Sequence, residues 1–416
     1  MKKTIFTLSA IVALAFTGCM NDEAPPILQD TDNQVNPGDN TVSVSGMISE
    51  STTWTNNTIY VLNQKVVVSS GVVLTIQAGT IIKGTEGTGS LASALIVAKG
   101  GKLNATGTAT EPIIFTSIND NITVGQTSGT NLDETNSGLW GGLIVLGNAP
   151  CSFSGDVEVL QIEGIPADDT FGLYGGSDAA DDSGVYQYIS IRHGGALIGE
   201  GNEINGLTLG GVGSGTVIEN IEVVGNVDDG IEFFGGTVNA SNLLIWAQGD
   251  DALDIDQAYS GTINNAVVIL GANSDHAFEI DGPEGAATGS FTLNNVSIIG
   301  NSVTEDGEYA DYRSGAMGST ENIYAYGFKE TSDVELDNDG VATNYNNGLL
   351  TFGAWEIVLP SGVSDVASIF VNKASAVEVS GFGSTATAVT EGVNTVGATT
   401  SLLSWTYANS KAGLGF

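Results

Sequence analysis

The sequence predicts an all-β fold: a right-handed parallel β-helix with loop insertions and an irregular C-terminal cap. The first observation behind this prediction is a repeat. Four segments between residues 219 and 299 each contain an asparagine that leads into a short apolar strand. These asparagines are Asn220, Asn242, Asn265 and Asn295, at steps of 22, 23 and 30 residues. Such a period is typical of a solenoid, in which one repeat forms one coil.

The second observation is another strand inside each coil, at residues 228–233, 250–255 and 275–280. Alternation places the apolar side chains of these segments on one face and Glu232, Asp254 and Glu279 on the other. Because parallel strands stack about 4.8 Å apart, like residues of successive coils should lie above one another. We therefore expect the apolar columns to point inward and the asparagine column to form hydrogen bonds from coil to coil.

The third observation is the composition. The chain has 57 glycines but only 11 lysines and arginines, which suits strands and tight corners. Strand patterns begin near residue 58, and we assign the β-helix to residues 45–345. Residues 120–136 and 165–184 are polar and predict loops, as do the acidic residues 330–345. We expect residues 346–416 to form the last coils and a cap.

Several motifs of the first half carry a family resemblance: GVVLTIQAGT (residues 71–80), KGGKLNATGT (99–108), PIIFTS (112–117), GLWGGLIVLGNA (138–149) and YISIRHGG (188–195). Over these motifs the chain resembles a large family of lipid-anchored or secreted, pectin-lyase-like β-helix proteins of Gram-negative bacteria. The resemblance implies a right-handed parallel β-helix. It implies no particular chemistry.

The N-terminus has the order of a signal peptide, with Lys2 and Lys3 before an apolar run that ends near Phe16. The following Thr-Gly-Cys19 is similar to the lipobox of bacterial lipoproteins. The resemblance implies removal of residues 1–18 and acylation of Cys19, which would anchor the chain in outer-membrane lipid. The anchored protein would face either the periplasm or the cell exterior. Residues 19–44 would then form a flexible acidic tether. The alternative is an uncleaved anchor helix.

The formal net charge of −37 excludes nucleic acid and other polyanions as favourable partners. The partners that this charge still allows are neutral glycans, cations and a basic patch on a surface protein. A lyase that acts on polyuronates is also disfavoured, because such an enzyme needs cationic side chains and the chain has only two arginines, Arg192 and Arg313. Apart from Cys19 the only cysteine is Cys151, so no internal disulfide is expected.

Acidic side chains on neighbouring coils predict a metal site. Asp254 and Asp256 should lie beside Glu279 and Asp281, so that four carboxylates converge. Like charges about 5 Å apart repel one another, and a hard cation such as Ca²⁺ removes that cost. The alternative is an acidic face that is simply solvated.

A catalytic alternative comes from the order of four other motifs. Asp228, the pair Asp250 and Asp251, His276 and Arg313 are similar in order and spacing to the motifs of polygalacturonase-type glycosidases. The resemblance implies acid and base roles for the aspartates, an assisting role for His276 and substrate binding by Arg313. An inverting mechanism needs carboxylates about 6.5 to 9.5 Å apart. Alternatively, aspartates at corners accept hydrogen bonds from backbone N–H groups.

Tryptophans are the other residues of interest for sugar binding, because their rings stack on pyranose faces. Trp246 aligns with Val224 and Ile269, so we expect it to be buried. Taken together, the sequence favours a non-catalytic surface protein that binds glycan or another surface component. A polysaccharide-degrading glycoside hydrolase is the alternative.

Overall fold

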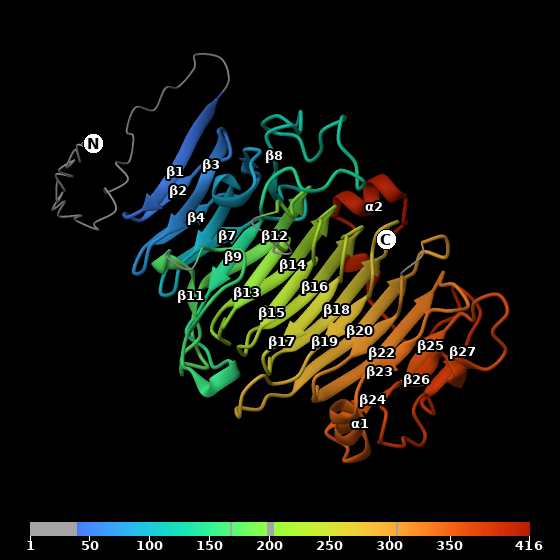
Figure 1. Ribbon diagram of the computed structural model, residues 1–416. Helices are drawn as coiled ribbons and strands as arrows, with labels where there is room; N and C mark the ends of the chain where they lie inside the picture. The colour runs from blue at the N-terminus through green and yellow to red at the C-terminus, as the bar shows by residue number, and fades with distance from the viewer. Residues whose placement is uncertain (1–39, 167–168, 198–203, 305–306) are drawn as a thin grey trace, which may run out of the picture.

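The computed structural model describes residues 40–166, 169–197, 204–304 and 307–416. Its strands wind into a stack of coils that runs from β1 at one end to β27 at the other (Figure 1). A 25-stranded network of parallel pairs joins these coils. The predicted right-handed parallel β-helix is confirmed, whereas Cys19 and most of the tether lie outside the described residues.

The strands fall into groups by their place in a coil. The longest strands bend at a corner: β1 (Thr41–Ile48), β3 (Ile59–Val68), β12 (Gly184–Arg192), β14 (Val217–Val224), β16 (Asn239–Trp246), β18 (Thr262–Ile269), β20 (Phe291–Ile299) and β22 (Gly318–Tyr326). A column of short strands closes the coils: β9 (Leu143–Leu146), β13 (Leu207–Gly210), β15 (Ile231–Phe234), β17 (Leu253–Asp256), β19 (Phe278–Ile280), β21 (Ala310–Tyr312), β23 (Val334–Leu336) and β26 (Phe370–Asn372).

The remaining strands belong to the two ends of the stack. They are β2 (Thr52–Trp54), β4 (Val73–Ile76), β5 (Ile81–Gly84), β6 (Ala94–Val97), β7 (Lys102–Thr106), β8 (Ile113–Ser117), β24 (Leu350–Phe352), β25 (Trp355–Ile357) and β27 (Ala386–Ala388). A separate antiparallel hairpin consists of β10 (Leu160–Gln161) and β11 (Leu173–Tyr174). The part of the chain that the structure describes contains two α-helices, α1 (Asp339–Asn346) and α2 (Tyr407–Ala412). Among the described residues no helix is both long and apolar enough to cross a bilayer.

Asparagines form the corner of the long strands, as predicted. Asn220, Asn242, Asn265 and Asn295 all have φ between 57° and 63°, a left-handed conformation that asparagine tolerates better than most residues. Strand pairing places these four residues directly above one another. Asn265 Nδ2 donates to Asn242 Oδ1 over 2.8 Å, so the column is also joined by side-chain hydrogen bonds.

The predicted register of the short strands is also confirmed. Ile231 pairs with Leu253, and Leu253 pairs with Phe278. These apolar side chains are buried in one continuous core that runs through the stack. Trp246 is 8% exposed, in agreement with its predicted burial.

Two expectations for the C-terminal part are corrected. Residues 330–345 are not an acidic loop, because β23 continues the short-strand column there and α1 begins at Asp339. Residues 390–416, which we call the C-terminal strap, do not cap the end of the stack. The strap runs back along the side of the coils, so that α2 lies beside β12 and β14, far from β27 (Figure 1).

The strap lies along the outward side of the long strands and contacts two columns, that of Ser297 and Glu222 and that of the corner asparagines. Ala398 N donates to Ser297 Oγ on β20 over 2.9 Å, and Thr399 N donates to Asn265 Oδ1 on β18 over 2.6 Å. Further along, Ala408 N donates to Glu222 Oε1 on β14 over 2.7 Å. The strap therefore ties successive coils together and covers this side of the β-helix.

Candidate functional site: the acidic face

The short strands carry a row of carboxylates on their outward side, which we call the acidic face. It consists of Glu232, Asp254, Glu279, Asp311 and Glu335, one from each of β15, β17, β19, β21 and β23. Strand pairing places each above the next. The alternation of the strands thus brings five acids into one line.

Arg313 lies within this face and is bound by its carboxylates. Its guanidinium donates to Asp281 Oδ2 over 2.8 Å and also forms an ion pair with Glu279. Asp281 and Glu279 belong to the four residues predicted to hold Ca²⁺, together with Asp254 and Asp256. Two of the four therefore have an arginine as their counter-ion.

One end of the acidic face has a lysine in a similar role. Lys373 follows β26 and forms ion pairs with Glu335 and with Asp333, whose Oδ2 lies 3.6 Å from its Nζ. Two coils of the face thus receive a cation from a neighbouring coil.

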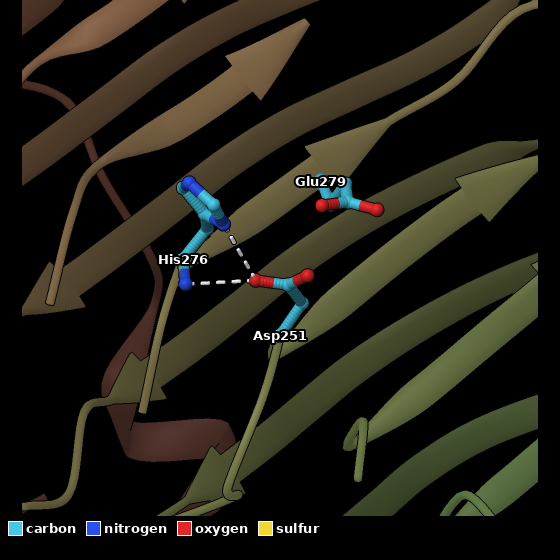
Figure 2. Close-up of side chains that lie close together, drawn as sticks. All are labelled: Asp251, His276 and Glu279. Atoms are coloured by element: carbon cyan, nitrogen blue, oxygen red, sulfur yellow. Dashed lines mark hydrogen bonds and ion pairs between the residues drawn. The ribbon is translucent and has the colours of Figure 1, made fainter. Parts of the chain in front are cut away.

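Aspartates form the corner where the chain enters the short strands. Asp251 N donates to Asp229 Oδ1 over 3.0 Å, and His276 N donates to Asp251 Oδ1 over 2.7 Å. Asp251 Oδ1 also lies 2.9 Å from His276 Nδ1, and Figure 2 shows the imidazole turned toward this carboxylate. The same backbone contact therefore repeats on two successive coils, which is the structural use expected of a corner aspartate.

His276 carries a positive charge at neutral pH. Burial favours the neutral imidazole, but the hydrogen bond and the charge of Asp251, with the charge of Asp275, outweigh it and raise the pKa of His276 to about 9. Glu279 lies close to this pair (Figure 2). His276 is thus a third cation supplied by the chain itself to the acidic face.

Asp250 is the exposed member of the corner. Single carboxylate oxygens of Asp228, Asp229 and Asp250 lie within 4.8 Å of one another. Partial burial and the neighbouring charges of Asp251 and Asp275 raise the pKa of Asp250 to about 6.

The residues predicted from the glycosidase resemblance are only partly gathered. Asp228 and Asp250 lie together, and Asp251 contacts His276. Arg313 instead engages Glu279 and Asp281. Two members of the acidic face, Asp311 and Glu335, were missed from the sequence, as were the neighbouring Asp229 and Lys373. The alternation of residues 310–313 and 334–337 matches that of 278–281 and was the available signal.

Residues 46–409 match the family described as a pectate-lyase like beta helix domain. The chain belongs to this family. No curated protein and no solved structure matches the chain.

A carbohydrate-related function fits a pectate-lyase-like β-helix domain. Membership does not distinguish binding of a carbohydrate from its hydrolysis.

Proposed function

We propose that the protein binds a neutral glycan at the acidic face and the exposed aspartate corner beside it, without catalysis, as a lipoprotein anchored through Cys19 at the outer membrane or cell surface. One observation carries the binding proposal: Arg313 and His276 are held by carboxylates of the protein itself. Arg313 is therefore not available to clamp an acidic sugar. Carboxylates at the exposed corner, such as that of Asp250, instead offer acceptors to sugar hydroxyls.

The net charge of the chain supports the same class of ligand. At −37 the protein repels polyuronates and other polyanions, whereas a neutral polysaccharide experiences no such repulsion. A hydroxyl-rich ligand gains charge-assisted hydrogen bonds from carboxylates without bringing a charge of its own. A basic patch on a surface protein is the alternative partner.

Two geometric facts argue against an inverting glycosidase mechanism. The Oδ1 atom of Asp251 already accepts from the backbone and the ring of His276. Asp228 and Asp250 have oxygens within 4.8 Å of each other, whereas an inverting glycosidase needs its carboxylates about 6.5 to 9.5 Å apart, to leave room for water.

The glycoside hydrolase remains the second candidate because of Asp250. An exposed carboxyl whose pKa is raised to about 6 is suited to general acid catalysis. In that case Asp250 would donate the proton to the glycosidic oxygen.

Binding is tested by passing the protein over immobilised neutral and uronate polysaccharides. We expect retention on a neutral polymer, no retention on the uronate polymer, and weaker retention of Asp250→Asn. Glu50→Gln, at an exposed site near the first coil, is the matched control and should bind like the wild type. Retention on the uronate polymer alone would contradict the proposal.

The lipid anchor has its own test. Mass spectrometry of the protein extracted from bacterial membranes should find an acylated N-terminal Cys19, and Cys19→Ser should release the protein into the soluble fraction. A membrane-bound Cys19→Ser protein that retains residues 1–18 would instead support the uncleaved anchor helix.

A further inference from the structure

Three carboxylates at one end of the acidic face lie unusually close together. They belong to Asp229, at the corner before β15, to Glu232 on β15 and to Asp254 on β17. One oxygen from each lies within 4.8 Å of the other two. Asp229 is 6% exposed and Glu232 is 5% exposed, so this cluster lies beneath the surface.

The protein supplies cations to the neighbouring acids but not to these three. Arg313 forms ion pairs with Glu279 and Asp281, and Lys373 forms one with Glu335. Within residues 40–166, 169–197, 204–304 and 307–416, no ion pair joins a lysine, arginine or histidine to any of the three clustered carboxylates.

Polar contacts satisfy only part of the cluster. Asn205 Nδ2 donates to Glu232 Oε2, and Asp251 N donates to Asp229 Oδ1 over 3.0 Å. Asp254 Oδ1 is shielded from solvent and has no hydrogen-bond partner among the described residues. A buried carboxylate oxygen without a partner is costly, and such atoms are rare in folded proteins.

When ionised, these three carboxylates would concentrate negative charge that no ion pair with a described residue balances. Burial, followed by the charges of the neighbouring acids, raises the pKa of Asp229, Glu232 and Asp254. Ionising all three requires a positive charge between them. A metal ion can supply that charge; without one, the carboxyls retain protons.

We propose that Asp229, Glu232 and Asp254 bind a divalent cation of the Ca²⁺ class, which fastens the coil of β15 to that of β17. Three carboxylates with no nitrogen or sulfur ligand favour a hard cation. Because two of the residues are buried, the ion is enclosed by the protein and serves the fold rather than contacting a ligand. The position differs from that expected from the sequence, where Asp256, Glu279 and Asp281 were grouped with Asp254.

The test uses the full chain, stripped with a chelator at pH 8 and then titrated with CaCl₂ by calorimetry. We expect one Ca²⁺ per chain and a rise of several degrees in the thermal midpoint at saturation. Glu232→Gln should weaken the affinity at least about tenfold, because ligand charge sets the affinity of such sites. Glu50→Gln, which removes an exposed carboxylate near the first coil, is the matched control and should bind calcium like the wild type.

Stability measurements in chelator and a titration at a second pH complete the test. Glu232→Gln removes one buried charge, so in chelator it should be at least as stable as the wild type. If it does not fold, Asp254→Asn takes its place in the same titration. The rise in the midpoint of the wild type should shrink at pH 5, where protons compete for the carboxylates. No calcium binding by the wild type at pH 8, or wild-type affinity in the folded cluster variant, would overturn the proposal and assign the cluster to shared protons.

Discussion

Arg313 provides the most informative perturbation, because its two possible roles predict opposite outcomes. In the structure its guanidinium contacts Glu279 and Asp281, whose side chains are 14% and 13% exposed. Arg313→Gln would remove the arginine counter-ion of both carboxylates. Removing one partner of a buried pair costs about 3 to 5 kcal/mol, and a fully exposed pair contributes about 0 to 1 kcal/mol. Since the arginine side chain is 36% exposed, we expect a loss of about 2 kcal/mol in the free energy of unfolding.

A double-mutant cycle measures this directly by urea denaturation. In the Glu279→Gln background, Arg313→Gln should cost clearly less, because one of the two carboxylates no longer carries a charge. Glycan binding by the folded Arg313→Gln protein should stay close to that of the wild type. Unchanged stability together with lost glycan binding would show that Arg313 holds the ligand, and it would refute our reasoning.

Three further predictions concern the fold. Because the pKa of His276 rises from 6.5 to about 9 on folding, its contribution of up to about 3 kcal/mol is complete below pH 6.5 and is lost toward pH 9. Denaturation at several pH values should show this loss, and Asp251→Asn should flatten it. Glu222→Ala leaves two amide groups of the strap without an acceptor and should cost about 2 to 3 kcal/mol. Limited proteolysis should then cut the strap faster, whereas Glu219→Ala on the same strand should not have this effect. Asn265→Ala, at φ 63°, should cost about 2 kcal/mol in urea denaturation, and Asn265→Gly about half of that, because glycine removes the hydrogen bonds without the backbone strain. Equal losses for alanine and glycine would contradict the role assigned to the left-handed corner.

Short-range patterns explain why much of the fold follows from the sequence. The asparagine repeat fixes one corner of each coil, and two-residue alternation fixes which side chains enter the core. The register of Glu232, Asp254 and Glu279 therefore needs no long-range information. By contrast, the counter-ion of Glu279 is Arg313, on the next coil and after a loop of irregular length. Predicting this ion pair from the sequence required extending the register of the short strands past residue 300.

The position of the strap could not be predicted from the sequence. Its contact between Ala408 and Glu222 joins residues 186 positions apart, and no periodic signal marks such a pair. Residues 330–345 were misjudged for a different reason, since their acidic composition obscured the alternation of Val334, Glu335 and Leu336. In a solenoid, an acidic residue on the outward side is compatible with a strand.

The central claim, that the acidic face binds a neutral glycan without cleaving it, is tested most directly by measuring reducing ends. A polysaccharide that retains the protein should be incubated with it at about pH 6, where Asp250 is half protonated. Our account predicts no release of reducing ends above that of a sample without protein. Release that Asp250→Asn abolishes would contradict the account and establish the protein as a glycoside hydrolase.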